Sequence, residues 1–369
     1  MKYKEKSDTL GLPDDFKFGI ELEAFNVQTK GKDGLYKGES AKYITDKNWH
    51  MATSMEESLV SEGGAELVSP ILKDTPSDWQ SVIDMCEHMK KFPGNKGDQV
   101  IADDKCGLHV HFDSECLTQN PERMRNFLRI YAESEELLYK MCNDKNNPTR
   151  KNAINKNLKG IQLISSIWRN GVAAPTGKKL LKQIENGTLK VSYEKFGKLK
   201  TIAGKLKLDE RRYSGLNLTN IGNVKKNTIE FRMANGSLDP EVIKQNVFLY
   251  ASLINTAIKI TERPEIYKQK LDQFYRTDVS EKEKAHDFLD LIMDNPEDKK
   301  IYMDRWESVK DAPVYQKNDE KGFAQNRFNR NQFRKIAERT PTALVQLAYS
   351  NIKRMKSRTI DKGDLEYDK

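Results

Sequence analysis

The sequence contains few cysteines, and none of them form a pair at the spacing typical of metal or redox sites. The four cysteines are Cys86, Cys106, Cys116 and Cys142, and no C-x-x-C motif occurs. Disulfides are typical of secreted proteins, whereas the cysteines of reduced compartments stay unpaired. The cysteine pattern therefore favours a cytoplasmic protein.

Long apolar segments are also absent. No apolar run approaches the roughly 20 residues that a membrane-spanning helix needs. The first residues, Met1–Lys6, are followed by no apolar stretch of the kind found in a secretory signal. We therefore expect a cytoplasmic protein without a membrane partner.

The common nucleotide-binding loops are missing as well. The chain has neither a G-x-x-x-x-G-K-[ST] motif nor a kinase-type glycine loop, which excludes ordinary P-loop proteins and protein kinases. Of its 369 residues, 37% are hydrophobic and 32% charged, which is enough for a sizeable core and about two domains. The net charge of +8 is compatible with acidic partners such as nucleotides, nucleic acid or acidic polypeptides.

The stretch F-G-I-E-L-E-A-F at residues 18–25 alternates as a half-buried strand does. Successive side chains of a strand point to opposite faces, so Glu21 and Glu23 share one face and their apolar neighbours share the other. Two carboxylates this close repel each other and raise each other's pKa unless a cation or hydrogen-bond donors separate them. An isolated pair of this kind can avoid the repulsion by pointing apart into solvent. A functional role for Glu21 and Glu23 is therefore favoured only if the same pattern occurs elsewhere in the sequence.

The same alternation returns in three later segments, A-E-L-V, L-H-V-H-F-D and T-I-E-F-R-M. Each puts ligand-type side chains on one face of a strand and apolar side chains on the other. The polar side chains are Glu66 in the first, His109, His111 and Asp113 in the second, and Thr228, Glu230 and Arg232 in the third. Side by side in one sheet, the segments would form a polar face of carboxylates, imidazoles and one guanidinium. Such a face is the outline of a metal and phosphate site.

Three helices are expected to cover the apolar face of this sheet. Each begins at a capping residue followed by proline, which suits the first turn of a helix. These starts are Thr75-Pro76, Asn120-Pro121 and Asp239-Pro240, and apolar residues follow each at helical spacing. We therefore predict an α+β fold, in which an antiparallel sheet has one polar, concave catalytic face and helices packed on the other face.

A catalytic domain is predicted over residues 16–262, with two less patterned segments inside it. Residues 26–48 are polar and contain glycine, so we expect a hairpin or mobile loop there, followed by a short strand at residues 49–53. Residues 144–212 form a basic, helical insertion that either closes over a nucleotide or is only a charged surface.

A helical, basic C-terminal extension is predicted over residues 263–369. Ser280 and Glu283 have the spacing of a capping box, and Thr340-Pro341 is a further helix start. One helical stripe of this extension consists of Arg327, Arg330 and Arg334. A solvated face is the favoured interpretation of this stripe, and an acidic or nucleic-acid partner is the less favoured one.

The ligand types narrow the chemistry without fixing the metal. Carboxylate oxygens suit Mg²⁺, whose coordination is usually completed by water and substrate phosphates, and a histidine ligand also admits Mn²⁺. Arg232 beside Glu230 favours phosphoryl transfer, because its charge can neutralise the transferring oxygens while the metal bridges nucleotide phosphates. Two alternatives stay open: a metal-dependent hydrolase that uses no nucleotide, and a non-catalytic module that binds through its basic C-terminal helices.

Taken together and in this order, the motifs F-G-I-E-L-E, G-G-A-E-L-V-S-P, C-G-L-H-V-H-F-D and N-T-I-E-F-R resemble the putative amidoligase family. That family belongs to the carboxylate–amine ligases with the glutamine synthetase and glutamate–cysteine ligase fold. The resemblance covers roughly residues 18–257 and is weak over residues 144–210. It implies an ATP-dependent ligase that phosphorylates a carboxylate to an acyl phosphate, which an amine then attacks to give an amide.

The resemblance also implies roles for single residues. The implied metal ligands are Glu21, Glu23, Glu66, Glu230 and one of the two histidines, His109 or His111. Glu230 and Arg232 would be catalytic, and Arg232 would hold the transferring phosphate. The implied nucleotide-binding residues are Arg232, Arg150, Arg212 and Asn217. Glu57-Ser58 stands where the family commonly has aspartate and serine, so the role of Glu57 stays open.

The implied cofactors are ATP and Mg²⁺, with Mn²⁺ as a substitute, and the implied partners are a carboxylate and an amine. Free amino acids, cell-wall components, peptides and protein side chains all remain candidate substrates. A phosphotransferase on the same fold is a further alternative, since it would release ADP without forming an amide.

Overall fold

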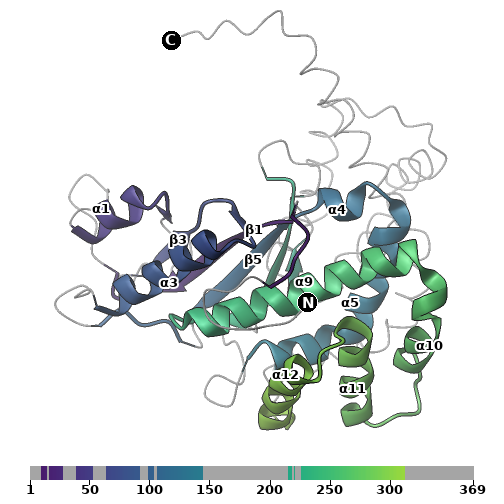
Figure 1. Cartoon of the computed structure of the whole chain (residues 1–369). Coiled ribbons are helices and arrows are strands. Elements are labelled where there is room, and N and C mark those ends of the chain that lie inside the picture. Colours follow the sequence, from purple (N-terminus) through teal and green to yellow (C-terminus); the bar gives the residue numbers. More distant parts are fainter. Residues whose placement is uncertain are drawn as a thin grey trace, which may run out of the picture.

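The computed structural model describes residues 10–14, 16–27, 39–52, 64–91, 99–103, 106–143, 215–217, 220 and 226–311. They form an antiparallel sheet in the order β2-β3-β1-β5-β7-β6, with β4 paired to the start of β1, and helices lie on one side of it (Figure 1). The strands are β1 (Lys17–Ala24), β2 (His50–Ala52), β3 (Ala65–Val68), β4 (Leu72–Lys73), β5 (Gly107–Asp113), β6 (Leu216–Asn217) and β7 (Thr228–Asn235). The predicted α+β class, the antiparallel pairing and the short strand after residue 48 are confirmed.

The pairing of the strands brings their polar positions into line. β1 lies between β3 and β5, and β5 lies between β1 and β7. Residues directly opposite each other in an antiparallel pair point to the same face of the sheet. The opposed pairs include Glu23 with Glu66, Glu21 with His109, and His111 with Glu230. The four segments with the shared alternation are therefore neighbours in one sheet, as predicted.

A bulge in β7 lies next to the polar residues. Leu108 is opposite Ala234 but Val110 is opposite Phe231, so β7 has one residue more than β5 over this step. An extra residue of this kind bends a strand and re-aims the side chains beside it, and bulges often lie next to active sites. Here it lets Arg232 point to the polar face while Ala234 is buried with the core.

Helices α3, α5 and α9 begin at the three predicted prolines. Their bounds are Pro76–Lys91, Pro121–Met141 and Pro240–Glu262. The side chains of Asn120 and Asp239 accept backbone N–H groups of the first turns of α5 and α9. The short helix α4 (Glu115–Thr118) follows β5, where the carboxylate of Asp113 accepts the N–H of Glu115 at 3.0 Å.

The apolar face of the sheet packs against these helices. Phe231 of β7 stacks on Tyr250 of α9, with ring centroids 4.3 Å apart, and meets Phe127 of α5 edge to face. Phe18 of β1 stacks on Trp79 of α3 at 5.2 Å. Burial of each such side chain stabilises the fold by roughly 1.5–3 kcal/mol. The helices thus cover the apolar face of the sheet, and the polar side chains of the strands lie on the opposite face.

Three further helices pack against α9 and α5 in the C-terminal part of the described chain. They are α10 (Pro264–Phe274), α11 (Glu281–Ile292) and α12 (Pro296–Val309), grouped together below α9 in the view of Figure 1. The predicted capping box of Ser280 and Glu283 is present at the start of α11. Phe274, Phe288 and Trp306 belong to the same apolar core as α9. None of the helices described is long and apolar enough to cross a membrane.

One local prediction was wrong. Part of the expected loop at residues 26–48 is the helix α1 (Glu39–Asp46). Ile44 of this helix is buried in the core, and Asn48 adopts a left-handed conformation with φ of 61° that turns the chain into β2. The glycines at positions 31, 34 and 38 suggested a loop, but they all precede the helix and leave its own residues free to form it.

Candidate active site

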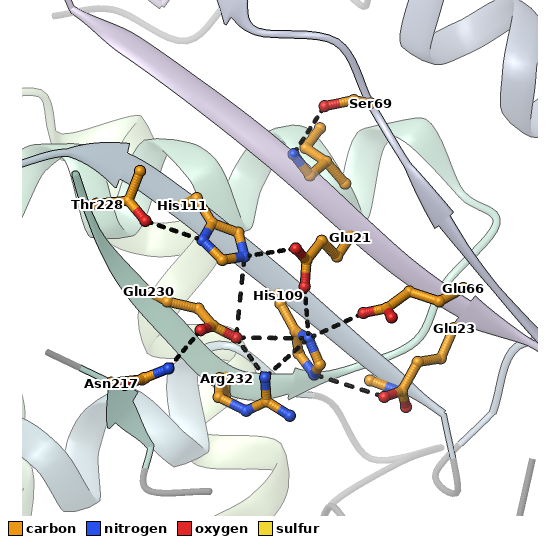
Figure 2. A network of polar contacts seen from close by, with 12 residues as sticks. Glu21, Glu23, Glu66, Ser69, His109, His111, Asn217, Thr228, Glu230 and Arg232 are labelled. Carbon is orange, nitrogen blue, oxygen red and sulfur yellow. Dashed lines mark hydrogen bonds and ion pairs between the residues drawn. The ribbon is translucent and has the colours of Figure 1, made fainter. Parts of the chain in front are cut away.

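Seven polar side chains from four strands meet on the polar face of the sheet (Figure 2). They are Glu21 and Glu23 of β1, Glu66 of β3, His109 and His111 of β5, and Glu230 and Arg232 of β7. Most of them are buried, although charged side chains are rarely buried unless they are paired or bind a metal. The structure therefore brings together the four glutamates, the two histidines and the arginine that the alternation predicted for this face.

His109 lies at the centre of the group and is 1% exposed. Its Nδ1 atom is 3.5 Å from Oε2 of Glu21, 3.7 Å from Oε1 of Glu66 and 3.6 Å from Oε1 of Glu230. These distances exceed the usual hydrogen-bond length, and only the contact with Glu21 is short enough for a weak hydrogen bond. Ligand atoms around one octahedral Mg²⁺ lie about 3.0 to 4.2 Å apart, given its metal–oxygen distances. The spacing therefore fits side chains arranged around a cation.

Among the described residues, two sets of three side chains place their ligand atoms within 4.8 Å of one another. One set is Glu21, Glu66 and His109, and the other is Glu21, His111 and Glu230. Glu21 belongs to both, because its Oε1 is 3.1 Å from Nε2 of His111 while its Oε2 faces His109. The donor set therefore fits two adjacent cations that share Glu21, each with one histidine.

Glu23 is placed differently from the other carboxylates. Its Oε2 accepts the backbone N–H of Gly107 at 2.5 Å, and its Oε1 is 3.7 Å from Nε2 of His109. It belongs to neither of the two sets above. The hydrogen bond ties the start of β5 to β1, and a direct metal contact of Glu23 stays a prediction.

The carboxylates have strongly different proton affinities. Burial, together with the charges of Glu21 and Glu23, raises the pKa of Glu66 from 4.5 to about 8. Burial also favours the neutral form of Glu21, but hydrogen bonds and charge from His109 and His111 outweigh it and hold the pKa of Glu21 below its ordinary value. Glu66 is thus the carboxyl group whose ionisation a bound cation would favour most.

Glu230 is held between two donors. Nη1 of Arg232 donates to its Oε1, and Nδ2 of Asn217 donates to its Oε2 at 2.7 Å. Burial raises the pKa of Glu230, but the charges of Arg232 and the two histidines outweigh this effect and keep the pKa lowered. Asn217, predicted to contact the nucleotide, therefore hydrogen-bonds a carboxylate of the polar face.

A pocket of about 360 Å³ lies beside Glu21 and His111. Lys17 and Lys226 line it, and Nζ of Lys226 is 3.6 Å from Oε1 of Glu21. Gly19 lines it as well, and a Cβ atom there would have only ordinary contacts at 3.9 Å. Sequence reasoning missed these residues. Lys17 and Gly19 nevertheless lie on β1 at alternate positions before Glu21, which puts them on the same face of the strand.

Ser69 was also missed, and it stands where β3 ends. Its N–H donates to the carbonyl of Ile20 at 2.8 Å, while its hydroxyl accepts the N–H of Ile20 at 2.9 Å (Figure 2). The hydroxyl thus takes the place of a backbone carbonyl in the ladder beside Glu21. The signal in the sequence is the Ser-Pro pair after the Glu66 segment, because the proline at position 70 has no N–H to continue a strand.

Several predicted features lie outside the described residues. They are Glu57, Arg150 and Arg212, the whole basic insertion at residues 144–212, and the C-terminal residues 312–369 with Arg327, Arg330, Arg334 and the Thr340-Pro341 helix start. The nucleotide contacts expected of Arg150 and Arg212, and the closing role of the insertion, stay predictions.

A comparison with known protein families identifies the family of this protein. A family model described as "Putative amidoligase enzyme" matches residues 14–254, which is more than half of the chain. The protein therefore belongs to this family, and its membership indicates a ligase-type enzyme. No curated protein matches the sequence. The matched region contains all seven polar residues of the sheet face.

Proposed function

We propose that the protein is a cytoplasmic, ATP-dependent carboxylate–amine ligase with a glutamine synthetase-like fold. It would form an amide or peptide-type bond through an acyl phosphate. The observation that carries the proposal is the position of Arg232, which is ion-paired to Glu230 of one candidate cation set and has its Nη1 3.3 Å from Nδ1 of His109 of the other. A metal-dependent hydrolase can work with the metal ligands alone, whereas enzymes that transfer a phosphoryl group commonly add an arginine or lysine that holds the transferring oxygens. Membership in the amidoligase family supports the ligase class.

Mg²⁺ is the proposed metal, with Mn²⁺ as a substitute. Glu21, Glu66, Glu230 and the histidines His109 and His111 would hold it, in the two sets that share Glu21. Burial, and after it the charges of Glu21 and Glu23, raise the pKa of Glu66, and a cation would compensate this negative charge. When bound, the metal would supply positive charge that offsets the negative charge of the nucleotide phosphates.

The pocket beside Glu21 is the proposed site of the ATP phosphates. Two lysines, Lys17 and Lys226, line it and complement a polyphosphate. The lack of a side chain at Gly19 leaves room above β1, so phosphate groups can approach the carboxylates and histidines.

The reaction has two steps. A carboxylate oxygen of the acid substrate attacks the γ-phosphorus of ATP, the bond from this phosphorus to the bridging oxygen breaks, and ADP leaves. Arg232 can hold two of the transferring oxygens with its planar guanidinium. The amine nitrogen then attacks the acyl carbon, phosphate leaves with the electron pair of the carbon–oxygen bond, and the proton lost from nitrogen passes to water.

An ADP-release screen tests this proposal. Purified protein, ATP and Mg²⁺ are incubated with pools of carboxylates and with hydroxylamine or natural amines, and products are identified by mass spectrometry. The proposal predicts ADP and an amide or hydroxamate in equal amounts, and none with Glu230→Gln. An acid labelled with ¹⁸O should pass one ¹⁸O atom to the released phosphate. ADP without an amide would indicate a phosphotransferase, and turnover without ATP a hydrolase.

A further inference from the structure

The strand β6 has two residues, and the second of them contacts Glu230. Asn217 lies directly opposite Glu230 in the pairing of β6 with β7, so both side chains point to the polar face. Nδ2 of Asn217 donates to Oε2 of Glu230 at 2.7 Å, and each residue is 3% exposed. A hydrogen bond between a neutral amide and a carboxylate is strong in such a buried setting.

The backbone fixes the position of this amide. The N–H of Arg232 donates to the carbonyl of Gly215 at 2.8 Å, which ties the start of β6 to β7. A Cβ atom at Gly215 would lie only 2.6 Å from the hydroxyl of Tyr139 and 3.2 Å from that of Tyr131, both on α5. The chain at Gly215 is therefore packed between β7 and α5 without room for a side chain.

The two oxygens of Glu230 consequently face different partners. Oε2 accepts from Asn217, while Oε1 accepts from Arg232 and lies 3.6 Å from Nδ1 of His109 and 3.8 Å from Nε2 of His111. Rotation of the carboxylate would break the bond to Asn217. The amide thus keeps Oε1 turned toward the histidines and toward the candidate cation set of Glu21, His111 and Glu230 (Figure 2).

We propose that Asn217 is a positioning residue that orients Glu230 for cation binding. It would act through Glu230 and would not itself be a ligand of the metal. The inference rests on the proposed metal site, but not on ATP or on amide formation. Hydrogen-bond partners that orient a metal ligand typically change metal affinity by about 10- to 100-fold when they are removed.

Calorimetric titration with Mn²⁺ alone, in the absence of nucleotide, tests this role. Asn217→Ala removes the donor and should weaken Mn²⁺ binding by about 10- to 100-fold. Asn217→Gln retains an amide and should recover part of the affinity. If Asn217→Ala does not fold, Asn217→Ser is titrated with the same expectation. Asn143→Ala is the matched control, since Asn143 is also buried and its Nδ2 also donates to β7, but to the backbone carbonyl of Met233.

The outcomes separate this inference from the proposed function. Wild-type protein that binds no Mn²⁺ would overturn the proposed metal site itself. Wild-type protein that binds Mn²⁺, together with Asn217→Ala binding within threefold of it, would overturn only the role of Asn217. An equal loss of affinity in Asn143→Ala would also overturn it, because the effect would then be a general weakening of β7.

Discussion

Arg232 and Glu230 are two residues apart on β7, form an ion pair and point to the same face of the sheet, while Phe231 between them stacks on Tyr250 in the core. This relationship allows two interpretations. Arg232 either holds the transferring phosphate or only compensates the charge of the carboxylates around it. Geometry distinguishes the two, since a guanidinium presents a planar fork and an ammonium group a point charge.

Arg232→Lys should keep most of the ATP affinity but lower turnover by roughly 10²- to 10³-fold, the typical effect of losing one donor to the transition state. The measurement is single-turnover ADP formation with a carboxylate identified by the ADP-release screen. Near-normal rates would show that the charge alone matters, and would leave Arg232 a counter-charge.

Glu66 should make the metal-free protein less stable as the pH rises. Its pKa in the folded protein is raised from 4.5 to about 8, so the folded state retains a proton there that the unfolded state has lost. This contribution to stability is fully present below about pH 4.5 and is lost as the pH rises through about 8. In EDTA, Tm should therefore fall over this window, and less steeply in Glu66→Gln.

Metal binding should reverse this effect of pH, because a cation at Glu66 displaces its proton. Mn²⁺ should bind more tightly at pH 8 than at pH 6, with release of a proton that calorimetry in buffers of different ionisation enthalpy detects. Equal pH slopes of Tm in EDTA for wild-type protein and Glu66→Gln would contradict the assigned proton affinity.

Strand alternation was enough to predict which side chains share the polar face. Glu21, His109 and Glu230 are on that face because apolar neighbours on each strand must meet the helices, and this requirement is local. The helix starts at Asn120 and Asp239 were predictable for the same reason, since capping depends on a few adjacent residues.

Contacts between distant segments were not predictable in this way. The pairing of Asn217 with Glu230 depends on the position of β6, a two-residue strand too short to show any period. The role of Ser69 depends on where β3 stops relative to β1, and the extra residue in β7 depends on its register with β5. Helix α1 was missed because the glycines before it dominated the local composition.

Ser69→Ala should destabilise the protein and weaken its metal site together. The N–H of Ile20 loses its acceptor, and an unsatisfied buried donor costs about 1–3 kcal/mol of unfolding free energy. Because Glu21 follows directly, Mn²⁺ binding should weaken as well. Urea denaturation and Mn²⁺ titration measure the two effects.

Ser81→Ala is the matched control for this prediction. The hydroxyl of Ser81 accepts from the indole of Trp49 at 3.1 Å, away from the polar face of the sheet. It should lower stability and leave Mn²⁺ affinity unchanged. Mn²⁺ binding that is unchanged in Ser69→Ala would show that this hydroxyl only supports the fold.

Gly19→Val should narrow the pocket without disturbing the sheet. A Cβ atom at this position has only ordinary contacts, and valine suits a strand. ATP binding should weaken by about tenfold or more, a difference of about 1.4 kcal/mol, while Mn²⁺ binding without nucleotide stays the same. Gly19→Ala should have a smaller effect. Unchanged ATP affinity in the valine variant would place the nucleotide elsewhere.

Calorimetric titration with ATP, in Mg²⁺ and in EDTA, tests the central claim that this polar face is a metal-dependent nucleotide site. The account predicts saturable binding in Mg²⁺, weaker by at least about tenfold in EDTA and similarly weakened in Glu230→Gln, whose far-UV spectrum should match that of the wild-type protein. ATP binding of equal affinity in EDTA, or no binding of ATP in Mg²⁺, would contradict it.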